Sequence, residues 1–171
     1  MEYNSGCIKF DLPDGACLDL LEQVLATMAK WKQHQKDYTE AAGFLLGYQN
    51  RTTGNITITD ITEPQPCDFR TRCFCRIKDV NHYRKIKNSV AYKNFYIGVW
   101  HTHPQAVPKP SAVDWNDWSE AIHKDKSGAN YLIFIILGTS SFRIWVGDPV
   151  TKEIIEIQES PIVDGIYLKG E

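Results

Sequence analysis

The sequence lacks a run of apolar residues long enough to cross a membrane. Its most apolar segment, residues 131–137, has seven residues, whereas a membrane-spanning helix needs about 20. The N-terminus lacks both the basic region and the apolar stretch of a secretory signal. We therefore expect a cytoplasmic protein that does not bind a membrane.

Neither sign of charge dominates the sequence. It contains 19 lysine and arginine residues and 21 aspartate and glutamate residues, and the formal net charge is −2. The basic residues are interspersed, apart from Arg70, Arg72 and Arg76 and a short run at residues 84–87. Because nucleic-acid binding needs a basic face, we expect no nucleic-acid partner.

The five cysteines lack the paired Cys-x-x-Cys spacing that is typical of zinc sites. Cys67, Cys73 and Cys75 lie near one another in sequence, but their spacing argues against a second metal site. In the absence of a secretory signal, an odd number of cysteines is most simply explained by free thiols in a reducing cytosol.

Repeats, low-complexity tracts and interdomain linkers are also missing. A chain of 171 residues has room for one domain, so we expect a single domain over residues 1–171 with its core at about 18–157. Apolar periodicity predicts an α/β fold in which helices flank a mixed sheet. The expected helices cover residues 18–35, 79–91 and a segment from Ser111; the expected strands cover 8–12, 43–48, 56–61, 95–100, 131–138, 141–146 and 153–159, and a loop near the site, residues 63–76, leads to a strand through Phe74.

The most informative segment is residues 99–104, Val-Trp-His-Thr-His-Pro. The aromatic and β-branched residues that lead into it predict a buried strand. Side chains alternate along a strand, so His101 and His103 would share one face while Thr102 points away. Two imidazoles placed in this way can bind one metal ion.

A carboxylate follows the histidine pair. Prolines at positions 104, 108 and 110 interrupt regular structure, and the apolar pattern then predicts a helix that begins near Ser111 and has Asp114 in its first turn. Ser111 by itself is also explained as a helix cap. Together with the histidines, Asp114 completes a set of three ligands, which leaves the fourth position of a tetrahedral zinc open to water, as in catalytic sites.

Glu40 precedes an apolar strand punctuated by glycine, Ala-Ala-Gly-Phe-Leu-Leu-Gly. On its own it would be a solvated residue, because glutamate is rarely buried. However, Glu-x-x-Gly-x-Leu-x-Gly followed by His-x-His-x10-Asp resembles the signature of the JAMM (MPN+, or JAB) metalloprotease family. The matching positions are Glu40, Gly43, Leu45, Gly47, His101, His103, Pro104, Pro110, Ser111 and Asp114.

The resemblance implies a JAB/MPN fold, which is cytidine deaminase-like, with a curved sheet and zinc at a strand end. It implies that His101, His103 and Asp114 bind one Zn2+ ion. Glu40 would hold and deprotonate the zinc-bound water and then pass the proton to the leaving amine. Ser111 would help to stabilise the oxyanion.

The resemblance also indicates a class of substrate. JAMM enzymes mostly cleave after the C-terminal tail of ubiquitin or a ubiquitin-like modifier, at peptide or isopeptide bonds. The segment around the histidines most resembles small stand-alone bacterial JAB peptidases, which occur beside E1/E2-like proteins in anti-phage operons. In the CBASS systems, such a peptidase removes a cGAS-like nucleotidyltransferase from targets joined to its C-terminus. The implied partner is therefore a protein substrate with an extended C-terminal tail.

Three alternatives remain open. A JAB peptidase that trims a sulfur-carrier protein in metabolism would use the same mechanism on another substrate. A non-catalytic MPN scaffold normally lacks the ligands, whereas Glu40, His101, His103 and Asp114 are all present. A DNA-associated relative of the RadC type would need a basic surface, which the sequence does not provide.

Overall fold

A mixed sheet forms the centre of the molecule over residues 6–157, the part of the chain that the computed structural model describes. Its eight strands lie in the order β1-β2-β4-β3-β7-β8-β9-β10, in which β2–β4 and β7–β8 are parallel pairs and the others are antiparallel. The strands are β1 (Cys7–Asp11), β2 (Cys17–Leu21), β3 (Ala42–Gln49), β4 (Ile56–Ile61), β7 (Phe95–Thr102), β8 (Leu132–Leu137), β9 (Phe142–Gly147) and β10 (Ile154–Glu156). A separate hairpin consists of β5 (Phe69–Thr71) and β6 (Phe74–Arg76).

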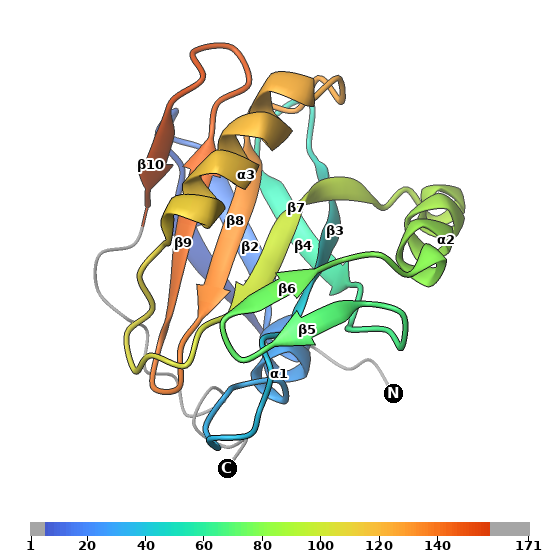
Figure 1. Ribbon diagram of the computed structural model, residues 1–171. Helices are drawn as coiled ribbons and strands as arrows, with labels where there is room; N and C mark the ends of the chain where they lie inside the picture. Colours follow the sequence, from blue (N-terminus) through green and yellow to red (C-terminus); the bar gives the residue numbers. More distant parts are fainter. Residues whose placement is uncertain (1–5, 158–171) are drawn as a thin grey trace.

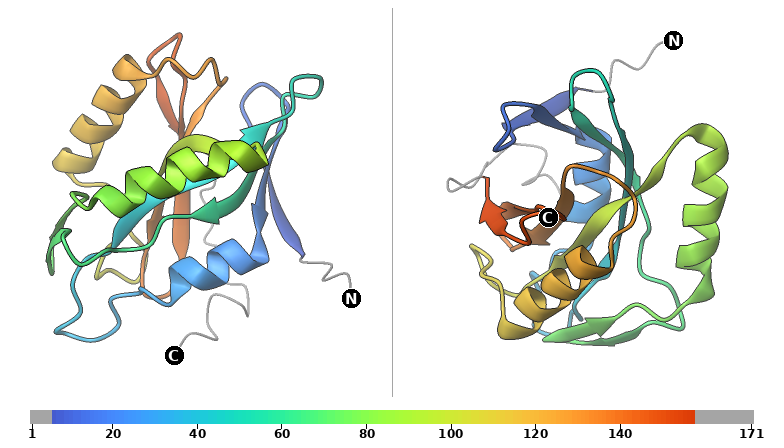
Figure 2. Two further views of the ribbon diagram at one scale, coloured as in Figure 1. Left: turned by 90° about the vertical axis from the view of Figure 1, so that its right-hand side faces the viewer. Right: turned by 90° about the horizontal axis from the view of Figure 1, so that it is seen from above.

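Helices cover both faces of this curled sheet (Figures 1 and 2). Helix α1 (Glu22–Ala29) packs against one face, α3 (Ala112–Lys124) packs against the other, and α2 (Val80–Ser89) lies beside β3 and β7. Alternate residues of β8 belong to the two cores: Ile133 and Ile135 belong to the α1 side, whereas Phe134 packs with Trp118 of α3. A strand that is buried on both faces is apolar throughout, as expected for the centre of an α/β sheet.

The structure confirms the expected mixed sheet with flanking helices and corrects one helix. Residues 18–21, expected to begin a helix over 18–35, belong to β2, and α1 covers only Glu22–Ala29. Leu18 and Leu20 are fully buried and pair with β4, so tertiary burial overrides the helical spacing of the apolar residues. Of the expected strand 153–159, β10 covers Ile154–Glu156, and residues 158–159 lie outside the described part.

Within residues 6–157, every helix is too short or too polar to cross a bilayer.

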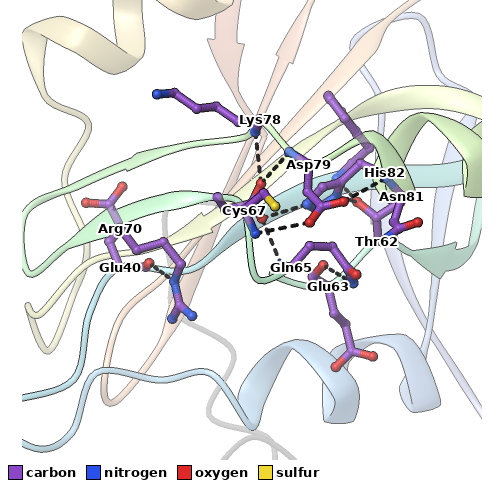
Figure 3. A network of polar contacts seen from close by, with 12 residues as sticks. Glu40, Thr62, Glu63, Gln65, Cys67, Arg70, Lys78, Asp79, Asn81 and His82 are labelled. Carbon is purple, nitrogen blue, oxygen red and sulfur yellow. Dashed lines mark hydrogen bonds and ion pairs between the residues drawn. The ribbon is translucent and has the colours of Figure 1, made fainter.

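A buried polar network anchors the loop that leads into the β5–β6 hairpin (Figure 3). The Asp68 carboxylate lies 2.7 Å from Nε2 of His82, and Nδ1 of His82 lies 2.7 Å from the Thr62 hydroxyl. Both side chains of the Asp68–His82 pair are inaccessible to solvent. Burial by itself would raise the pKa of Asp68. Hydrogen bonds from three backbone N–H groups and from His82 outweigh this effect and lower the pKa to about 2. The backbone donors are Gln65, Lys78 and Asp79.

We expect Asp68→Asn to lower the free energy of unfolding at pH 7 by about 2 kcal/mol, because hydrogen bonds to a buried charge are lost. The pKa of Asp68 is lower in the folded protein than in the unfolded chain, so this stabilisation is complete above about pH 4 and disappears as the pH falls toward 2. Urea denaturation should therefore show a difference from wild type that shrinks over this range. The exposed control Asp37→Asn should change little, and an equal loss in both variants would contradict the expectation.

Candidate metal centre

His101 and His103 lie at the C-terminal end of β7, on one side of the strand. Their Nε2 atoms are 3.1 Å apart. Thr102, which lies between them, points to the opposite side, where its hydroxyl donates to Gln33 Oε1 at 2.9 Å. The alternation predicted for the strand is thus confirmed, and the two imidazoles converge.

Asp114 reaches the same point from the first turn of α3. Ser111 caps this helix: its Oγ accepts a hydrogen bond from the Asp114 N–H at 3.2 Å, and the Asp114 carboxylate accepts one from the Ser111 N–H at 2.6 Å. The predicted helix start is therefore confirmed. The reciprocal cap orients the carboxylate, whose oxygens lie 3.0 Å from His101 Nε2 and 3.4 Å from His103 Nε2.

The spacing of these three side chains is compatible with a shared zinc ion. In a tetrahedral site with ligands about 2.0–2.1 Å from the metal, the ligand atoms lie about 3.3 Å from one another. Here the two histidine Nε2 atoms are 3.1 Å apart, Oδ1 of Asp114 lies 3.0 Å from His101 Nε2, and Oδ2 of Asp114 lies 3.4 Å from His103 Nε2. Burial and the neighbouring His101 lower the pKa of His103, which favours the neutral imidazole that binds a metal. The donor set is thus already assembled for one divalent cation.

Glu40 lies two residues before the start of β3 and is only 7% exposed, so the alternative of a solvated glutamate is wrong. One of its carboxylate oxygens lies within 4.8 Å of a ring nitrogen of both His101 and His103. The backbone of Glu40 is held on both sides by the hairpin. Its N–H donates to the Thr71 carbonyl at 2.7 Å. Its carbonyl accepts from Arg70 Nε at 2.7 Å, a contact that Figure 3 shows.

The carboxyl groups of Glu40 and Asp114 differ in their pKa. Burial raises the pKa of Glu40 to about 7, an effect that His101 opposes and Asp114 reinforces. Burial also acts to raise the pKa of Asp114, but hydrogen bonds with His101 and Ser111 lower it to about 2. Asp114 therefore stays ionised, as a metal ligand must, whereas Glu40 can gain and lose a proton near neutral pH.

The centre opens into a pocket of about 610 Å³. One wall comes from α3 and the other from the β5–β6 hairpin, which contributes Cys73, Phe74, Cys75 and Arg76. A loop near the site is expected here from the sequence, but none of these wall residues was predicted to line the site. The contacts of Arg70 and Gln33 with other segments of the site were also not predicted. Their spacing from the motif residues gave no signal.

The tryptophans near the motif have different positions. Trp100 is fully buried, and Trp118 is buried and stacks on Phe134 at 4.9 Å between ring centroids. Both are core residues, the position that burial favours for such large side chains, although Trp118 also lines the pocket. Trp115 is 41% exposed and is not a core residue.

The cysteines form no disulfide. All five are free thiols, and within residues 6–157 no cluster of metal-binding side chains includes one of them.

A curled mixed sheet with a His-His-Asp donor set at a strand end, faced by a buried glutamate, defines a JAB-type domain. The chain belongs to the family described as prokaryotic homologs of the JAB domain, whose model matches residues 21–147. The resemblance inferred from the motif is thus confirmed at the level of the family.

The chain is also similar to two named relatives and to one solved structure. A protein from Vibrio cholerae named CD-NTase/cGAS isopeptidase is 30% identical over 81% of this chain and 85% of its own length. A protein of the same name from Escherichia coli is 27% identical over 84% of this chain and 88% of its own length. The solution structure of a protein from Desulfitobacterium hafniense matches with a TM-score of 0.56 at 15% identity, covering 80% of this chain and 87% of that one. This last likeness concerns the fold alone.

We expect the purified protein to contain about one zinc per chain and His103→Ala to contain almost none, because two remaining ligands hold zinc poorly. Metal content after dialysis, measured by mass spectrometry of the element, checks this expectation. The control His123→Ala removes an exposed histidine of α3 and should keep the wild-type content. Equal zinc in His103→Ala and wild type would contradict the assignment.

Proposed function

We propose that this chain is a zinc-dependent isopeptidase that cleaves after the C-terminal tail of a cGAS-like nucleotidyltransferase or a ubiquitin-like modifier joined to a target protein. The observation that carries the proposal is the buried Glu40 carboxylate, which lies within 4.8 Å of two histidine ring nitrogens that share a donor set with Asp114. Relatives that match most of the chain are named CD-NTase/cGAS isopeptidase, which supports the nucleotidyltransferase as substrate. The proposal also includes a setting in CBASS defence beside E1/E2-like proteins.

His101, His103 and Asp114 would hold the zinc ion. When bound, zinc would polarise the scissile carbonyl and lower the pKa of a water molecule toward about 7. It would also lower the pKa of Glu40, as any nearby cation does. The value of about 7 that burial gives to Glu40 leaves this carboxylate able to act as a base near neutral pH.

Glu40 accepts a proton from the attacking water as the bond between the water oxygen and the carbonyl carbon forms. It then delivers this proton to the amide nitrogen as the C–N bond breaks, so that a neutral amine leaves. This second transfer is essential because an amide anion is a poor leaving group. One residue can perform both steps because the backbone that carries the carboxylate is fixed by hydrogen bonds at both its N–H and its carbonyl group.

Ser111 contributes the third function, stabilisation of the negative charge on the carbonyl oxygen. Its Oγ accepts the capping hydrogen bond from Asp114, and a serine hydroxyl can accept and donate at the same time. Capping uses only an acceptor position of the hydroxyl, so the hydroxyl proton, which can also face the Asp114 carboxylate, can turn to the oxyanion when the substrate reacts. Ser111 lines the pocket, which supports this role.

The lining of the pocket supports a substrate segment with apolar side chains. The pocket runs between α3 and the hairpin, with apolar residues of both walls along it: Phe74, Ile77, Val113, Trp118 and Ala121. The hairpin has only two strands, and an added peptide strand can gain affinity through main-chain hydrogen bonds. A C-terminal tail could therefore reach the centre without a folded partner surface.

We expect the wild-type protein to cut a fusion of a nucleotidyltransferase C-terminal tail and a reporter protein immediately after the last native residue of the tail. Glu40→Gln should keep its zinc but lose activity on the order of 10³-fold, because general acid–base catalysis is removed. Mass spectrometry of the products maps the cut. The exposed control Glu153→Gln should cleave like wild type.

Two results would count against this proposal. Full activity of Glu40→Gln would show that another group is the base. If the nucleotidyltransferase fusion stays intact while a sulfur-carrier fusion is cut, the mechanism stands and the substrate is the sulfur carrier instead.

Ser111→Gly separates capping from catalysis. Glycine replaces serine at a helix N-cap at a cost of only a few tenths of a kcal/mol, whereas loss of an oxyanion donor lowers kcat on the order of 100-fold. We therefore expect near wild-type thermal stability together with strongly reduced kcat on the same fusion. If kcat stays at the wild-type value, Ser111 acts only as the helix cap.

A further inference from the structure

Gln33 lies in the irregular segment between α1 and β3 and is 2% exposed. Its buried carboxamide makes three hydrogen bonds. Oε1 accepts from the Thr102 hydroxyl at 2.9 Å, and Nε2 donates to the carbonyls of Tyr38 at 3.2 Å and Arg72 at 2.8 Å. Both amide protons and the amide oxygen are therefore used, which is the condition for burying such a group without a penalty.

These three partners belong to three different parts of the site. Thr102 stands between His101 and His103 in the sequence. Tyr38 lies two residues before Glu40 in the segment that carries it. Arg72 follows Thr71, whose carbonyl accepts the Glu40 N–H at 2.7 Å. One side chain thus connects the ligand strand, the glutamate segment and the hairpin.

Thr102 continues this connection to the residue next to Glu40. The Thr102 hydroxyl accepts from the Ala41 N–H at 2.9 Å, and the Thr102 N–H donates to the Ala41 carbonyl at 2.9 Å. Because the hydroxyl donates its own proton to Gln33, its direction is fixed by partners on both sides. The backbone at Ala41 is therefore held against the strand that carries both histidines.

We propose that Gln33 is a positioning residue that fixes the Glu40 carboxylate relative to the imidazoles of His101 and His103. The inference rests on the proposed role of Glu40 as the base. Neither Gln33 nor Thr102 lines the pocket, so neither touches substrate, and both act only through the residues that they hold. Displacement of a catalytic group by about 1 Å can lower a rate on the order of 100-fold, which makes such a remote contact kinetically important.

Gln33→Met tests the proposal, since methionine is similar in length and has no donor or acceptor to replace the amide. We expect one zinc per chain, an unchanged KM and a kcat lowered on the order of 100-fold, because the loss concerns the chemical step and not binding. The control Gln23→Met, at an exposed position of α1, should behave like wild type.

A pair of variants at Thr102 supplies a second test that does not depend on Gln33→Met folding. Thr102→Ser keeps the hydroxyl and should retain most of the wild-type kcat. Thr102→Val keeps the shape of the side chain but loses the hydroxyl, so it should resemble Gln33→Met. Equal kcat for the serine and valine variants would overturn the proposal, as would wild-type kcat in Gln33→Met.

Hydrogen exchange gives a readout that is independent of activity. In Gln33→Met and Thr102→Val, the amide protons of Glu40 and Ala41 should exchange at least about 10-fold faster than in wild type, while those of the central strand β8 keep their rates. Unchanged exchange at both positions would overturn the proposal. If the wild-type protein cuts no fusion, the proposed function fails by itself, and the exchange rates still decide whether Gln33 holds Glu40.

Discussion

The candidate centre depends on the register in which β3 pairs with β7. Ala42 lies opposite His101 and Gly43 lies opposite Trp100, which places Glu40 beside the end of the strand that carries both histidines. Gly43 is required for this arrangement, because a Cβ at this position would lie 1.9 Å from the Thr62 carbonyl oxygen. A shift by one residue would turn every side chain of β3 to the other face of the sheet and would carry Glu40 away from the proposed metal ligands.

Within this frame, two carboxylates of similar chemistry receive different properties from their surroundings. Asp114 stands in the first turn of a helix and accepts hydrogen bonds from Ser111, near the positive end of the helix dipole. Glu40 is buried, and its side chain has no comparable set of donors, so burial dominates and raises its pKa to about 7. Because the two pKa values differ in this way, Asp114 suits the proposed role of a charged metal ligand and Glu40 suits the proposed role of a proton carrier.

Sequence reasoning recovered the parts of this site that are local in the chain. The alternation of His101 and His103 and the cap formed by Ser111 and Asp114 follow from strand and helix geometry over a few residues. Glu40 was found only through the family motif, since sixty residues separate it from the histidines. Gln33 gave no signal, because its contact with Thr102 spans 69 residues and a buried glutamine has no distinctive spacing. The helix expected to begin at residue 18 is wrong for the same reason. Residues 18–20 pair with β4, which is far away in the sequence.

The β5–β6 hairpin both lines the pocket and supports the proposed base. The segment that leads into the hairpin is held by the buried Asp68–His82 pair. The turn of the hairpin is held by Gln33, which donates a hydrogen bond to the Arg72 carbonyl. The contacts to Gln33 and to the Glu40 N–H use backbone carbonyls of the hairpin, whereas the pocket wall includes hairpin side chains such as Phe74 and Arg76. Substitution of these wall side chains can therefore change the lining of the pocket while the hairpin backbone continues to hold Glu40, which would allow the proposed catalytic geometry to serve different substrates.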